Sequence, residues 1–190
     1  MSKQTKNTKQ ANDDAFVSDD VVGSGKASYF KLETGDNEVR LISKPITGWI
    51  AWGEDEEGNK KPTRTPITEE PDDESDGENP PKKFMACVVI DAADDEVKIW
   101  EITQQSIIKA IKALSSNPKW GNPFTYSLSI EKKGEGMKTR YTVNPNPKAP
   151  ISKAAIKVAS EKPCNLDALY EGADPWDEKN HDTVTEYHFK

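Results

Sequence analysis

The pattern of apolar residues over positions 84–143 restricts this chain to few folds. Three segments alternate between apolar and polar residues, and a fourth is a short apolar run bounded by polar residues. Both patterns indicate β-strands. Between the second and third of them, residues 103–114 repeat apolar side chains at helical spacing. The order strand, strand, helix, strand, strand therefore predicts an antiparallel sheet with one inserted helix. The four strand segments are 84–90, 97–102, 124–130 and 138–143.

A further strand is expected ahead of this region. Residues 37–43 alternate, with Arg40 on the face opposite Val39. Residues 49–52 resume an extended pattern, as the second half of a strand that bends near Gly48. Five strands with a helix after the third are typical of the oligonucleotide-binding (OB) barrel. We therefore predict a mainly β fold, a single five-stranded OB-type barrel with a helix after strand three. Short C-terminal helices are expected at 152–160 and 163–170.

Composition indicates that part of the chain does not pack. Only 34% of the 190 residues are hydrophobic and 31% are charged, which is thin for a fully packed chain of this length. We therefore expect disordered acidic segments around one folded domain. The predicted divisions are a disordered N-terminal arm at 1–27, an OB domain at 28–172 with an acidic loop insertion at 54–81, and an acidic C-terminal tail at 173–190.

The distribution of charge favours a nucleic-acid partner although the total does not. The net charge of -7 is acidic, but residues 79–166 carry a net +6. The negative charge is concentrated in residues 54–78, net -8, and residues 167–190, net -5. Because binding depends on the local field, the sequence predicts a cationic core between two acidic segments.

Several functional classes lack a sequence signal. No apolar run approaches the ~18 residues of a membrane span, and the N-terminus has no secretory h-region, so we expect a cytoplasmic protein without a membrane partner. Two cysteines suit a reducing compartment. Both histidines, His181 and His188, lie in the tail, and no zinc spacing, P-loop or dinucleotide motif is present. We expect no enzyme, no catalytic residue, no metal, no cofactor and no small-molecule substrate.

Lysines and aromatic residues interleave on the predicted strands. Cations neutralise phosphates and flat rings stack on unpaired bases, so this combination suits single-stranded nucleic acid. Trp100 shares a strand face with Lys98, opposite Val97 and Ile99. If Val97 and Ile99 face the barrel interior, Trp100 is exposed and free to stack. The alternative, that Trp100 packs under a loop or the C-terminal helix, has equal weight.

Other aromatic residues and cations extend the candidate surface. Phe84 begins its strand, where a binding role and a core role are equally plausible, and of Trp49 and Trp52 we expect Trp52 to be the exposed ring. One basic hairpin contributes four further cations. The candidate single-stranded DNA (ssDNA) contacts are Trp100, Lys98, Trp52, Phe84, Lys82, Lys83, Arg40, Lys132, Lys133, Lys138 and Arg140.

Four segments give the chain a likeness to a known family. They are residues 48–52, 82–91, 97–107 and 139–145. Together they resemble the OB-fold ssDNA-binding proteins of tailed bacteriophages, over roughly residues 30–172. The resemblance implies a protein that coats and protects unpaired DNA in replication, recombination or repair, without strong sequence preference. It places such a protein in the host cytoplasm if it is phage-encoded.

The resemblance also implies a role for the acidic tail in recruiting replication or recombination proteins. Lys190 departs from the acidic or apolar end expected of such tails. A tail of this charge could equally compete with DNA for the basic core or act as a solvated spacer. The candidate partner-binding residues are Asp174, Asp177, Glu178, Asp182 and Glu186.

Two alternative functions stay open at this point. The chain could be an OB-type RNA-binding module, in which case RNA would compete equally with DNA. It could instead be an acidic protein-interaction adaptor whose loop and tail mimic nucleic-acid charge, in which case ssDNA would not bind.

Overall fold

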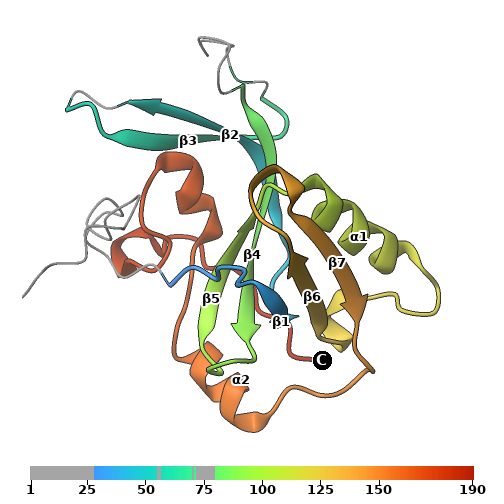
Figure 1. Cartoon of the computed structure of the whole chain (residues 1–190). Coiled ribbons are helices and arrows are strands. Elements are labelled where there is room, and N and C mark those ends of the chain that lie inside the picture. The colour runs from blue at the N-terminus through green and yellow to red at the C-terminus, as the bar shows by residue number, and fades with distance from the viewer. Residues whose placement is uncertain (1–27, 55–56, 70, 72–79) are drawn as a thin grey trace, which may run out of the picture.

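The computed structural model describes residues 28–54, 57–69, 71 and 80–190 (Figure 1). The protein is mainly β, with seven strands in one antiparallel sheet. The strands are β1 (Gly35–Leu41), β2 (Ile46–Glu54), β3 (Lys60–Pro66), β4 (Lys82–Asp91), β5 (Val97–Ile102), β6 (Leu128–Lys133) and β7 (Arg140–Pro145). The helices are α1 (Gln105–Ser116) and α2 (Lys153–Ser160), with short 3-10 helices η2 (Pro123–Thr125), η3 (Gly136–Lys138), η4 (Leu166–Glu171) and η5 (Glu178–Asn180).

Strand β4 is the centre of the sheet. It pairs with β5 along one edge and with both β1 and β2 along the other. Strand β1 also pairs with β6, which pairs with β7. The expected bent strand is therefore present as β1 and β2, which share β4 as a neighbour. All the segments predicted as strands contribute strands, and the predicted helix is α1.

The expected closed barrel is not confirmed, because the sheet is open. Closure would require β5 to meet β7, the two strands that end the order β5-β4-β1-β6-β7, and no such pairing occurs among the strands that the structure describes. Helix α1 contacts both of these strands.

Strand β3 corrects the prediction of an unstructured acidic loop at 54–81. Residues 60–66 pair with residues 48–54 of β2, with Pro62 opposite Trp52. The segment Lys-Lys-Pro-Thr-Arg-Thr-Pro has no apolar residue, so it carries no strand periodicity. An edge strand needs only one neighbour and tolerates proline, which is why this sequence can form one. Residues 55–56, 70 and 72–79 of the predicted loop lie outside the described residues.

Strands β4 and β5 are buried on both faces, which explains the continuous apolar run of β4. One core lies on the α1 side and includes Trp100 and Ile102 with Ile107 of the helix. The second core lies on the opposite face, where Ile99 and Val88 pack with Leu166 and other residues of the C-terminal segment, residues 151–190. The sheet therefore separates two apolar layers, and the C-terminal segment covers the layer on the face opposite α1.

Residues 173–190 are part of the fold, so the expectation of a disordered acidic tail is wrong. Tyr187 forms a β-bridge with Ser43, and the His188 amide donates to the Ile42 carbonyl at 2.6 Å. The His188 ring stacks on Phe124 with centroids 4.5 Å apart. The aromatic residues of this segment bury against the second core, and that burial outweighs its charged composition. The predicted arm at 1–27 lies outside the described residues.

Candidate nucleic-acid interface

Trp100 is a core residue, so of its two equally weighted alternatives the exposed one is wrong. Its side chain is 2% exposed and meets Phe30 edge to face, with centroids 5.5 Å apart. The predicted alternation is correct, but both faces are covered: Val97 and Ile99 point to the layer under the C-terminal segment, and Trp100 points to the α1 side. A base could stack on this ring only if the core opened.

Phe84 and Arg40 are also structural. Phe84 is 2% exposed and lies edge-on to Tyr170, as its core alternative proposed. Arg40 is buried, and its Nη2 donates to the carbonyl oxygens of Ala149 and Lys190, each at 2.6 Å. Burial lowers the pKa of Arg40. Arg40 is therefore a weak candidate for an ssDNA contact, because this side chain ties β1 to two later segments.

Lys98 is held by carboxylates at the turn between β4 and β5. Its Nζ lies 2.6 Å from Asp91 and also contacts Asp94. Partial burial disfavours the ammonium, but the hydrogen bonds to these two carboxylates prevail and raise the pKa of Lys98. The cation is already neutralised locally, so it is a weak candidate for a phosphate contact.

The β6–β7 hairpin keeps most of its predicted cations on the surface. Lys132 is partly buried and donates to the Leu32 carbonyl at 2.8 Å. Lys133 pairs with Glu131 at 2.6 Å but its side chain is 72% exposed. Lys138 and Arg140 are exposed, and within the described chain neither forms an ion pair. The exposed cations of this hairpin are Lys133, Lys138 and Arg140.

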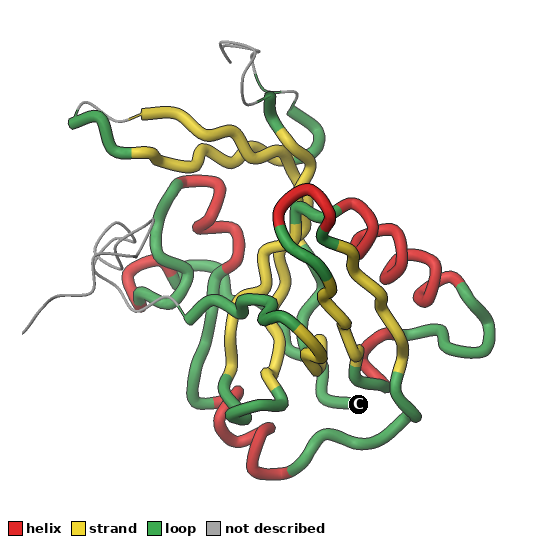
Figure 2. Tube along the Cα trace, in the orientation of Figure 1, coloured by secondary structure: helices red, strands yellow, loops and turns green. Residues whose placement is uncertain are grey.

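The β2–β3 hairpin, here called the arm, projects from the body of the sheet (Figures 1 and 2). Trp52 lies on it and is 56% exposed, which confirms the expectation that this ring faces solvent. Lys60 and Lys61 are exposed on the partner strand. No carboxylate of the described residues lies within ion-pair distance of either lysine. The arm thus presents a flat ring and two lysines that form no ion pair among the described residues, with the exposed Glu54 opposite Lys60.

A second ring and cation meet at the base of the arm. Trp49 is opposite Lys83 in the β2–β4 register, and the Lys83 Nζ lies 4.9 Å from the centre of the indole. This is a cation–π contact on a half-buried ring. Lys82 is exposed next to Lys83, and Gln105 donates to the Lys83 carbonyl at 3.1 Å, tying α1 to this strand.

Gly48 lies where β2 pairs with both β3 and β4. A Cβ at residue 48 would lie 2.1 Å from the Thr65 carbonyl oxygen and 2.8 Å from the Phe84 ring. Only glycine fits so close to a backbone and an aromatic ring. Close packing therefore requires glycine at position 48, and the role of Gly48 in a strand bend stays a prediction.

Lys60, Lys61 and the pairing of Trp49 with Lys83 were not predicted from the sequence. The two lysines lay in a segment assigned to an acidic loop. Trp49 lies directly opposite Lys83 when the bent first strand is aligned with the next strand. This alignment is the signal that could have predicted the pair, since cross-strand neighbours share a face.

The predicted tail residues lie on the folded C-terminal segment. The Asp174 side chain accepts from the Trp176 amide at 2.9 Å, and the Asp177 side chain accepts from the Lys179 amide at 3.0 Å, so both stabilise turns. The other three are exposed carboxylates: Glu178, Asp182 and Glu186.

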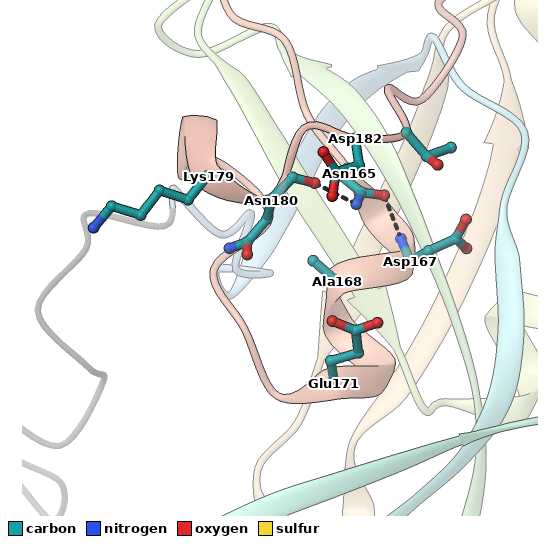
Figure 3. Close-up of a pocket in the computed structure, with 8 residues that line it drawn as sticks. Asn165, Asp167, Ala168, Glu171, Lys179, Asn180 and Asp182 are labelled. Atoms are coloured by element: carbon teal, nitrogen blue, oxygen red, sulfur yellow. Dashed lines mark hydrogen bonds between the residues drawn. The ribbon is translucent and has the colours of Figure 1, made fainter.

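An acidic cavity opens on this segment (Figure 3). It has a volume of about 190 Å³, and its charged lining residues are Asp167, Glu171, Lys179 and Asp182. The Asn165 side chain spans it, donating to the Asn180 carbonyl at 2.5 Å and accepting from the Asp167 amide at 3.1 Å. Acidic residues outnumber the single lysine in this lining, so the surface is negative here.

Within the described residues, no cluster of three or more histidine, cysteine or acidic side chains could hold a metal ion. No helix in this part of the chain has the length and apolarity to cross a membrane.

The fold and its surface define a class: a mainly β protein that presents rings and unpaired cations on a projecting hairpin. No protein-family model matches the chain, and no solved structure matches it. A curated relative does. The probable ssDNA-binding protein of Escherichia phage T5 is 28% identical over 141 residues, covering 62% of this chain and 54% of the relative. The chain thus spans about half the length of that relative.

Proposed function

We propose that the protein binds ssDNA, and that it coats and protects unpaired DNA during replication, recombination or repair. The observation that carries the proposal is the arm, where Trp52 is exposed beside free lysines and the Trp49–Lys83 pair lies at the base. The similarity to a relative named for ssDNA binding supports it.

The architecture we propose is of the OB type. The order β5-β4-β1-β6-β7, with α1 between the third and fourth of the five strands in the chain, supports this assignment. Strand β3 is then an addition that extends the loop after the first strand into the arm.

Binding would be passive. Stacking of a base on an aromatic ring contributes about 1–3 kcal/mol, and lysines neutralise phosphates without reading base edges. A protein that binds only the unpaired strand disfavours the duplex by mass action. Little sequence preference is therefore expected.

The path of the DNA would differ from the usual one. OB folds bind oligonucleotides on the face of strands two and three, which here are β4 and β5. The outer face of those strands packs against Leu166 and Leu169 of the C-terminal segment. We propose instead that the single-stranded DNA lies along the arm and along the exposed start of β4, at Lys82 and Lys83.

The acidic C-terminal surface has a separate proposed role. The carboxylates of the folded segment would contact replication or recombination proteins while DNA occupies the arm. The proposed contacts are the residues predicted for the tail: Asp174, Asp177, Glu178, Asp182 and Glu186.

Titrations of the tryptophan fluorescence with oligo-dT, oligo-rU and duplex DNA test the proposal. We expect quenching by oligo-dT, weaker binding of duplex, and a log–log salt slope of about -0.7 per phosphate neutralised. Equal binding of oligo-rU would favour the RNA-binding alternative. The absence of binding to every oligonucleotide at low salt would favour the adaptor.

A further inference from the structure

The tip of the β6–β7 hairpin presents an apolar side chain directly to solvent. Met137 is 100% exposed, whereas Met85 is 6% exposed in the core. Among the large hydrophobic residues exposed in the described chain, Met137 is the most exposed. Its immediate neighbours in the chain are Gly136 and Lys138.

The hairpin holds this side chain outward through its own hydrogen bonds. The Lys138 amide donates to the Glu135 carbonyl at 3.0 Å, and the Thr139 amide and hydroxyl both donate to the Gly136 carbonyl. Gly134 has a φ of 81°, and a Cβ there would lie 2.7 Å from the Lys138 carbonyl oxygen. The tip therefore has a defined shape before any ligand binds, which lowers the entropic cost of binding.

Charge decides which partner suits this tip. Lys133, Lys138 and Arg140 are exposed around Met137, against the carboxylates of Glu131 and Glu135. Lys133 and Glu131 already neutralise each other, which leaves two cations and one carboxylate. The apolar, polarisable thioether can pack on a flat apolar surface, and the cations on either side of it can bind anionic groups. Single-stranded DNA offers both, because its unpaired bases are flat and lie between phosphates.

We propose that Met137 packs against a base of the bound ssDNA, while Lys138 and Arg140 contact the flanking phosphates. This rests on the proposed function and gives the DNA a second contact, separate from the arm. The thioether adds an apolar contact that is independent of salt, and the two cations supply the salt-dependent part of the hairpin's affinity.

Oxidation of the methionines in the full chain tests this contact. Hydrogen peroxide transfers one oxygen atom to the thioether sulfur, giving the sulfoxide and water, and mass spectrometry measures the rate at each methionine. We expect saturating oligo-dT to slow oxidation of Met137 several-fold. An abasic oligonucleotide of equal length, which has the phosphates without the bases, should protect far less. Met85 is the internal control and should react slowly throughout.

The outcomes separate this inference from the proposed function. If tryptophan quenching shows bound oligo-dT while Met137 oxidises at its free rate, the contact does not exist and ssDNA binding stands. Equal protection by the abasic oligonucleotide would also overturn the base contact. If oligo-dT does not bind at all, the proposed function itself fails.

Variants at this exposed position give an independent test. Met137→Ala should weaken oligo-dT binding by about 2- to 10-fold with an unchanged salt slope, and Met137→Leu should retain most of the affinity. Lys138→Ala should instead reduce the salt slope by about one unit. A Met137→Ala protein with unchanged affinity for oligo-dT would overturn the proposal.

Discussion

At the scale of single residues, Trp52 and Trp100 show how burial divides a candidate site. Both are flat rings on strands, but one is 56% exposed and the other is 2% exposed. Trp52→Ala should weaken ssDNA binding by about 1–3 kcal/mol and change stability by no more than about 0.5 kcal/mol. Trp100→Ala should lower the free energy of unfolding by about 3–5 kcal/mol.

Fluorescence titration and urea unfolding of both variants measure the two effects. A Trp52→Ala protein that binds oligo-dT as tightly as the parent would remove the arm from the interface. A Trp100→Ala protein of unchanged stability would contradict its place in the core.

The lysines at the start of β4 give a second prediction at this scale. Lys82 and Lys83 are exposed beside Trp49, so replacing both by alanine should weaken ssDNA binding and reduce the salt slope by about one unit or more. The matched control is Lys153→Ala with Lys157→Ala on α2, which removes two exposed lysines distant in the chain. Equal losses in both pairs would mean that only total charge matters.

At the scale of elements, the arm depends on one glycine. A Cβ at Gly48 would meet the Thr65 carbonyl at 2.1 Å, so Gly48→Ala must push β3 away from β2 at the base of the arm. We expect faster hydrogen exchange in the β3 amides and weaker ssDNA binding, while the amides of β6 keep their protection. Uniform loss of protection across the sheet would mean that the change unfolds the whole domain.

At the scale of the whole molecule, the C-terminal segment covers the second core and excludes solvent from it. Truncation after Gly172 removes Tyr187, His188 and Phe189, whose rings pack on the second core and on Phe124. Each of these partly buried rings contributes less than the about 3–5 kcal/mol of a fully buried ring, but the loss of all three together should make the truncated protein melt well below the parent. Differential scanning calorimetry measures this.

A control separates this packing from the charge of the segment. Asp182→Asn with Glu186→Gln keeps the rings and removes two exposed carboxylates, so it should leave the melting temperature nearly unchanged. If the truncated chain instead kept its stability and bound ssDNA more tightly, the segment would be a competitor for the DNA site.

Buried thiol and phenol groups should make the folded protein less stable at alkaline pH. Burial raises the pKa of Cys87 and of Cys164 to about 12, and burial raises the pKa of Tyr29 to about 12. Unfolded thiols lose their protons near pH 8.5. The unfolded chain then binds fewer protons than the folded one, so stability should fall as the pH rises from about 9 to 12. Urea midpoints that stay constant over this range would contradict the burial of these groups.

Local periodicity alone determined most of the elements of this protein. The alternation at 97–102 and the helical spacing at 103–114 correspond to β5 and α1, because each pattern creates an apolar face that must be buried. The position of the exposed Trp52 also followed, since it borders a polar segment that cannot cover it. These features depend on neighbours in the chain.

Tertiary structure decided which residues pack against each face of a strand. Alternation placed Trp100 and Ile99 on opposite faces of β5, but both faces are buried, so it could not say which layer covers either. Strand β3 forms because β2 offers it a hydrogen-bonding edge, and residues 173–190 fold because Tyr187 and Phe189 find an apolar surface made by distant strands. Burial depends on contacts between residues far apart in the chain, and no local pattern contains them.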